Sequence, residues 1–128
     1  MRRSFVVVAF VLIAFLSSCA SKMVITGTIT WTDKASFSST KDCYVGMAAG
    51  ALSFTSATTV PTTATYSKVT AGTTTSFNFE ATKAGNETFF VFFDVNSNGT
   101  YDYSSDSLVG TTLSYIDGNA AVTVSAYY

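Results

Sequence analysis

The chain has 128 residues, a formal net charge of −1 and no histidine, and this length suits a single domain. Its basic residues all lie at or before Lys83, so the C-terminal third carries acidic groups only. The lack of a basic face argues against nucleic acid as a partner, and the lack of histidine excludes histidine metal sites and serine–histidine catalysis.

The first residues have the three parts of a secretory signal. Arg2 and Arg3 make a basic start, residues 5–16 (FVVVAFVLIAFL) are apolar, and small residues lead to Cys19. A helix over this apolar stretch, rising about 1.5 Å per residue, is too short for a hydrocarbon core of roughly 30 Å. The pattern therefore predicts a cleaved signal and not a permanent membrane anchor.

Residues 16–19 (LSSC) resemble the bacterial lipobox, in which an aliphatic residue and two small residues precede a lipidated cysteine. The resemblance implies covalent lipid on Cys19, and acyl chains bind a membrane with about 0.8 kcal/mol for each buried CH2. By the same family convention, Ala20 implies the outer membrane of the cell envelope. The chain then divides into a signal peptide (1–18), a lipidated N-terminus with a short tether (19–24) and one domain (25–128). The alternative is an ordinary cleaved signal with an incidental cysteine.

Removal of the signal leaves an acidic chain with one thiol outside the lipid site. The formal net charge goes from −1 to −3 because Arg2 and Arg3 are lost. Cys43 then has no partner for an internal disulfide, so the domain must fold without one. Because Cys43 lies in an apolar run, we expect a buried small hydrophobe. A reactive thiol is the alternative.

The rest of the chain predicts an all-β domain. Short alternating runs are separated by turn residues, and no segment shows the helical period of apolar residues. The expected strands cover residues 23–31, 43–49, 64–69, 75–81, 88–95, 108–115 and 120–127. The run at 88–95 (TFFVFFDV) is the most apolar, which predicts a central strand buried on both faces. Seven short strands indicate an antiparallel two-sheet sandwich, with a long loop over 53–65 and a hairpin turn at 117–119.

One segment carries a metal-binding pattern. Residues 94–102 (DVNSNGTYD) have the form D-x-N-x-N-G-x-x-D, which matches the start of a calcium loop. Calcium takes roughly six to eight hard oxygens, and a glycine permits the sharp turn that gathers them. The candidate ligands are Asp94, Asn96, Asn98, Thr100, Asp102 and Asp106. The usual closing glutamate is absent, since Ser105 stands there and Asp106 follows it. The alternative is a metal-free turn.

The run from Phe89 to Asp102, followed by Asp106, resembles the end of a carboxypeptidase-regulatory-like or Cna-B-like β-sandwich domain, a kind common in bacterial surface proteins. Residues 25–29 (ITGTI) resemble the first strand of such domains, and residues 44–47 (YVGM) resemble their second. The resemblance implies a prealbumin-like or immunoglobulin-like sandwich without catalytic activity.

We do not expect an enzyme. The remaining route to catalysis is a carboxylate pair for glycoside hydrolysis, drawn from Glu80, Glu87 and Asp94. These residues stand at expected strand ends among many threonines, where structural or solvated roles are usual.

Two functions of different class remain open. The first is a lipid-anchored envelope module, structural or adhesive, whose acidic loop is stabilised by calcium. The second is a ligand-binding lipoprotein that presents aromatic rings to a glycan or a protein, with Tyr101 and Tyr103 beside the loop as candidates. An exposed line of rings favours the second function, and buried rings favour the first.

Overall fold

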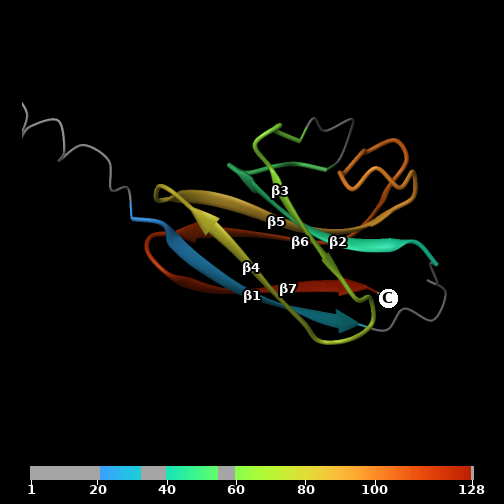
Figure 1. Cartoon of the computed structure of the whole chain (residues 1–128), viewed down its shortest axis with the longest axis horizontal. Coiled ribbons are helices and arrows are strands. Elements are labelled where there is room, and N and C mark those ends of the chain that lie inside the picture. Colours follow the sequence, from blue (N-terminus) through green and yellow to red (C-terminus); the bar gives the residue numbers. More distant parts are fainter. Residues whose placement is uncertain (1–20, 33–39, 55–59, 128) are drawn as a thin grey trace, which may run out of the picture.

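The computed structural model describes residues 21–32, 40–54 and 60–127, and within these ranges the chain forms two β-sheets packed face to face (Figure 1). The strands are β1 (Met23–Thr32), β2 (Asp42–Ala49), β3 (Thr65–Val69), β4 (Thr75–Ala81), β5 (Gly85–Asp94), β6 (Ser107–Ile116) and β7 (Ala120–Tyr127). One sheet has the order β4-β1-β7 and the other has the order β3-β2-β5-β6. The seven-stranded sandwich expected from the alternating sequence is confirmed.

The pairing departs from an antiparallel arrangement at one place. β1 runs parallel to β7, with Ile25 opposite Ala120 and Trp31 opposite Ala126. The other neighbouring strands pair antiparallel. Parallel neighbours need a long connection between them, and here the connection is the remainder of the domain. The local pattern of apolar residues carries no information about this choice.

The core between the sheets follows the two-residue period of the strands. Ile25 and Ile29 of β1 are fully buried, and Gly27 lies between them on the same face. A Cβ at Gly27 would collide with the ring of Phe77, which fills the space above the glycine. The alternation of Ile25, Gly27 and Ile29 therefore reflects packing against β4.

β5 is buried on both faces, as its continuous apolar sequence predicts. Phe89, Val91 and Phe93 face the core between the sheets. Phe90 and Phe92 point to the outer face, where they form a second apolar cluster. Its buried members are Ala48, Phe90, Phe92 and Tyr101, with Tyr44, Leu52, Phe54, Val60, Ala64, Tyr66 and Leu108 packed around them. We call this set the outer cluster.

The outer cluster is covered by segments that contain no strand. Phe54 and Val60 belong to the long loop expected over 53–65, of which residues 55–59 lie outside the described residues, and Leu52 comes just before it. Tyr101 comes from the loop between β5 and β6. The two loops therefore supply the second layer that a sheet face needs when its outward side chains are phenylalanines.

The signal peptide and Cys19 also lie outside the described residues. Across the described ranges, no helix is long and apolar enough to cross a membrane.

Candidate functional site

The candidate site is the loop between β5 and β6, residues 95–106, at one end of the sandwich. β5 ends at Asp94, which pairs with Asp42 at the start of β2. The N-terminal end of β1 lies at the opposite end, because Met23 pairs with Ala81, just before the turn into β5. In Figure 1, the orange loop and the blue start of β1 accordingly stand at opposite ends of the domain.

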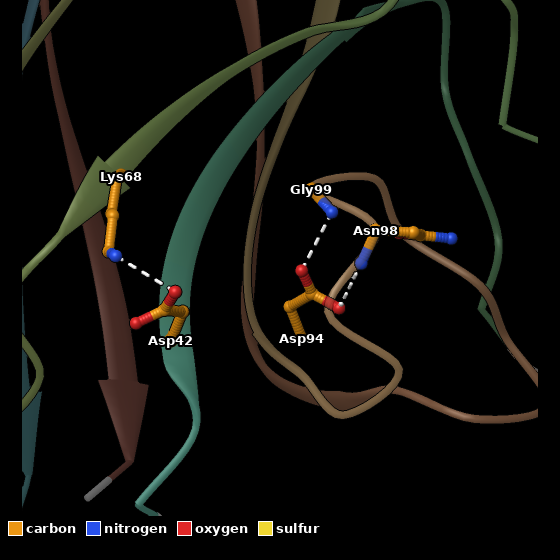
Figure 2. Close-up of polar contacts among 5 residues, drawn as sticks. All are labelled: Asp42, Lys68, Asp94, Asn98 and Gly99. Carbon is orange, nitrogen blue, oxygen red and sulfur yellow. Dashed lines mark hydrogen bonds and ion pairs between the residues drawn. The ribbon is translucent and has the colours of Figure 1, made fainter.

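Asp94 closes the first turn of the loop. Its side chain is 2% exposed. One carboxylate oxygen accepts the backbone N–H of Gly99 at 2.7 Å, and the other accepts that of Asn98 at 3.2 Å (Figure 2). The turn requires the left-handed backbone at Gly99, with φ of 76°, and at Ser97, with φ of 61°. Asp94 therefore holds the backbone rather than pointing to an open position.

Asp106 holds the other side of the loop in the same way. Its Oδ1 accepts the N–H of Val95 at 2.9 Å, and its Oδ2 accepts the N–H of Asp102 at 2.8 Å. In return, the N–H of Asp106 donates to the carbonyl of Asp102 at 2.8 Å. These contacts tie the start of the loop to its end.

The side chains of Asn96, Asn98 and Asp102 converge at the centre of the loop. The amide Nδ2 of Asn96 donates to Asp102 Oδ2 at 2.7 Å, and that of Asn98 donates to the same oxygen at 2.6 Å. Thr100 contributes from the side, since its N–H and hydroxyl donate to Asn98 Oδ1 at 2.8 and 2.9 Å. Two amide groups thus surround one carboxylate oxygen.

This arrangement fits a cation only in part. Over the described residues, no three side chains of the His, Cys, Asp and Glu types gather as a metal-binding group. Asp94 and Asp106 are occupied with backbone N–H donors. Asn96, Asn98 and Asp102 do share a centre, and rotation of an asparagine amide exchanges its nitrogen for its oxygen. These three residues are the ones that could hold a hard cation.

The two tyrosines beside the loop have different environments. Tyr101 is 7% exposed and makes edge contacts with Phe92 at 5.2 Å and Phe54 at 5.5 Å between ring centroids. Burial raises the pKa of its hydroxyl. Tyr103 is 41% exposed. Of these two candidates for ligand binding, Tyr101 fills the outer cluster and Tyr103 is the exposed one.

Tyr66 is a member of this region that the sequence did not single out. Its ring lies edge-on to Phe90 and Phe92, with centroids 6.0 and 5.9 Å away. Burial raises its pKa, and a hydrogen bond with the backbone of Tyr101 opposes that shift. The pairing of β2 with β3 places Tyr66 opposite Gly46, and this register was not readable from the weak pattern at 64–69.

Cys43 lies on β2 and is 3% exposed. Burial raises the pKa of its thiol to about 12. A thiol with this pKa is almost entirely protonated at neutral pH, and the thiolate is the reactive form. The environment favours the buried-hydrophobe interpretation over the reactive one.

Comparison of the chain with protein-family models, with curated proteins and with solved structures gives no match. The assignment of this chain to an all-β two-sheet architecture therefore depends on its own strands and their pairing.

Proposed function

We propose that this chain is a lipid-anchored module of the bacterial cell envelope, non-catalytic and structural or adhesive, held at the outer membrane through acyl chains on Cys19. The resemblance to carboxypeptidase-regulatory-like and Cna-B-like domains is part of this proposal. The export signal and the lipobox-like residues 16–19 support the location. The burial and the distribution of the aromatic rings support the structural role.

The aromatic rings are the observation that carries the structural role. Phe90, Phe92 and Tyr101 are buried in the outer cluster. Among the residues that the structure describes, the large exposed tyrosines are Tyr103 in the loop, Tyr115 on β6 and Tyr127 on β7. They come from three different elements and two sheets. Because glycan-stacking surfaces need adjacent open rings, this distribution favours a structural module over an aromatic binding platform.

The geometry of the domain suits a short tether. β1 begins at Met23, and at about 3.5 Å per residue the four steps from Cys19 span at most about 14 Å. The loop 95–106 lies at the far end of β5, a strand of 10 residues that rises about 3.3 Å per residue. A lipid on Cys19 would thus keep the start of β1 near the membrane and present the loop away from it.

The test of the anchor is the Cys19→Ala variant, compared with the wild-type chain in the same bacterial host. The wild-type chain should fractionate with membranes and carry an acyl mass at its N-terminus, and the variant should lose both. The variant should keep the melting temperature of the wild-type domain, because the described strands begin after residue 22. Membrane association that survives in the variant would contradict the anchor.

We further propose that calcium binds the loop through Asn96, Asn98 and Asp102, with the carbonyl of Thr100. The convergence of the Asn96 and Asn98 side chains on Asp102 Oδ2 supports this candidate. A ligand that binds only the folded state raises stability by RT ln(1 + [L]/Kd), about 2.7 kcal/mol at a hundredfold excess over Kd. Millimolar calcium should therefore raise the melting temperature.

Asp102→Asn should abolish the rise, because it removes the central carboxylate charge. Asp117→Asn, in the turn between β6 and β7, is the matched control and should respond to calcium like the wild type. If calcium leaves the melting temperature of the wild type unchanged, the loop is a metal-free turn and the envelope proposal stands without it.

A further inference from the structure

A pocket lies at the end of the sandwich opposite the loop 95–106. It has a volume of about 330 Å³ and opens where β4 turns into β5, between the ends of the two sheets. Met47 and Ala81 give it apolar walls, Thr65 adds a hydroxyl, and Lys83 and Glu87 bring opposite charges. Small-molecule sites have volumes of about 300–1,000 Å³, so this pocket suits a small ligand.

Glu87 stands at a position of β5 where the alternation of the strand would place another apolar core residue. Along β5 the residues that face the other sheet alternate as Glu87, Phe89, Val91 and Phe93. Glu87 is 9% exposed, while Phe89 below it is fully buried. The sequence pattern thus places a carboxylate on the core face at the mouth of the sandwich, where it lines the pocket.

This carboxylate has no hydrogen bond or ion pair with the residues that the structure describes. Glu87 is 9% exposed and its carboxylate still reaches the pocket, and a carboxylate that is largely removed from water is costly unless a cation or hydrogen-bond donors satisfy it. Burial raises the pKa of Glu87, and the positive charge of Lys83 lowers it by less. The other carboxylate at the rim, Glu80, is already paired with Lys22 at 2.7 Å.

We propose that this pocket binds a small organic ligand through a primary ammonium group, with the Glu87 carboxylate as its counter-ion. An ammonium group brings three N–H donors and a positive charge, which together satisfy a buried carboxylate better than water does. The apolar walls at Met47 and Ala81 accommodate the carbon chain of the ligand. Lys83, on the same pocket lining, is the cation of the chain that competes with the ligand for Glu87. This proposal is independent of the lipid anchor and of calcium.

The binding test uses the purified full chain and three probes of equal length: n-butylammonium, n-butanol and butyrate. Chemical-shift titration of β2, β4 and β5 amides should show saturable binding of butylammonium. Butanol should bind at least about tenfold more weakly, because it lacks the charge-assisted hydrogen bond, and butyrate should not bind. Equal binding of butanol and butylammonium, or no binding of butylammonium, would overturn the proposal.

Three substitutions locate the site. Glu87→Gln keeps the size of the side chain and removes its charge, so butylammonium affinity should fall at least about tenfold. Lys83→Met removes the competing ammonium and should raise the affinity several-fold. Glu80→Gln is the rim control and should change it by less than about twofold, because that charge is exposed and paired. Unaltered affinity in Glu87→Gln would place the ligand elsewhere, and the melting temperature of each variant reports whether it is folded.

Discussion

Asp94 stands directly opposite Asp42 across the β2–β5 pair, so two carboxylates occupy neighbouring positions at one end of the sheet. Like charges in such positions repel. The structure compensates each one separately. Asp94 is buried and accepts two backbone N–H groups from its loop, whereas Asp42 is exposed and pairs with Lys68 at 2.8 Å (Figure 2).

The two carboxylates should therefore differ in their effect on stability. Asp94→Ala removes the acceptor for the N–H groups of Asn98 and Gly99 and should lower the free energy of unfolding by about 1–3 kcal/mol. Asp42→Ala is the matched control and should cost about 0–1 kcal/mol, because its ion pair with Lys68 is exposed. Urea unfolding curves of the two variants measure the difference. A smaller loss for Asp94→Ala than for Asp42→Ala would show that the loop is not held by Asp94.

Gly46 and Phe90 form a second pair whose fit is testable. A Cβ at Gly46 would collide with the ring of Phe90 on the outer face of the sheet. Gly46→Ala should therefore cost about 1–3 kcal/mol, as is usual when a packed site receives an extra methyl group. Gly85→Ala is the control, because nothing lies within 4 Å of its added Cβ, and it should be close to neutral.

A rescue experiment separates this collision from a general intolerance of alanine in β2. The double variant Gly46→Ala with Phe90→Leu should be less destabilised than the sum of the two single variants, because the shorter side chain leaves room for the methyl group. Strict additivity of the two changes in unfolding free energy would refute the proposed contact.

Cys43 should be inert in the folded protein. Its thiol is buried, with a pKa of about 12, so the thiolate that reacts with alkylating reagents is scarce at neutral pH. Iodoacetamide should label the Cys43 peptide slowly in buffer and rapidly in urea, with the rate read by mass spectrometry. Fast labelling in buffer would mean that β2 opens far below the global unfolding free energy.

The sequence predicted the strands well because alternation and burial are local properties. The run at 88–95 contains Phe89, Phe90, Phe92 and Phe93 in near succession, and only a strand with both faces covered buries all of them. The pairing of the strands was harder to predict from the sequence. The parallel contact of β1 with β7 joins residues nearly a hundred positions apart, and no short-range pattern encodes it.

The residue types of the candidate site were visible in the sequence, but the contacts of their side chains were only partly predictable. The spacing of Asp94, Asn96, Asn98 and Asp102 predicted a calcium loop or a metal-free turn; the chain does turn tightly there, at Ser97 and Gly99, and calcium binding stays a prediction. It did not show that Asp94 binds backbone N–H groups, nor that Tyr101 turns inward to the outer cluster. The contacts of Asp94 and the position of Tyr101 both depend on how the loop folds over the sheet, which the spacing of residues does not show. Glu87 was noted only as a carboxylate at a strand end, and its burial became visible once β4 and β5 were placed around it.

The buried position of Glu87 also predicts how stability depends on pH. Because burial raises its pKa in the folded state above the ordinary value of 4.5, the folded protein holds this proton more tightly than the unfolded chain does. The stabilising contribution is fully present below pH 4.5 and is lost as the pH rises through the raised pKa. The other charged groups around the pocket are Lys83 and the Lys22–Glu80 pair.

Glu87→Gln should remove this dependence. The difference in melting temperature between the variant and the wild type should grow in favour of the variant from pH 4.5 upward, because glutamine carries no charge to bury. Asp117→Asn, at an exposed turn position, should leave the pH profile unchanged. A wild-type profile that Glu87→Gln does not alter would mean that the carboxylate is solvated in the folded protein. The same result would remove the reason for a cation in the pocket.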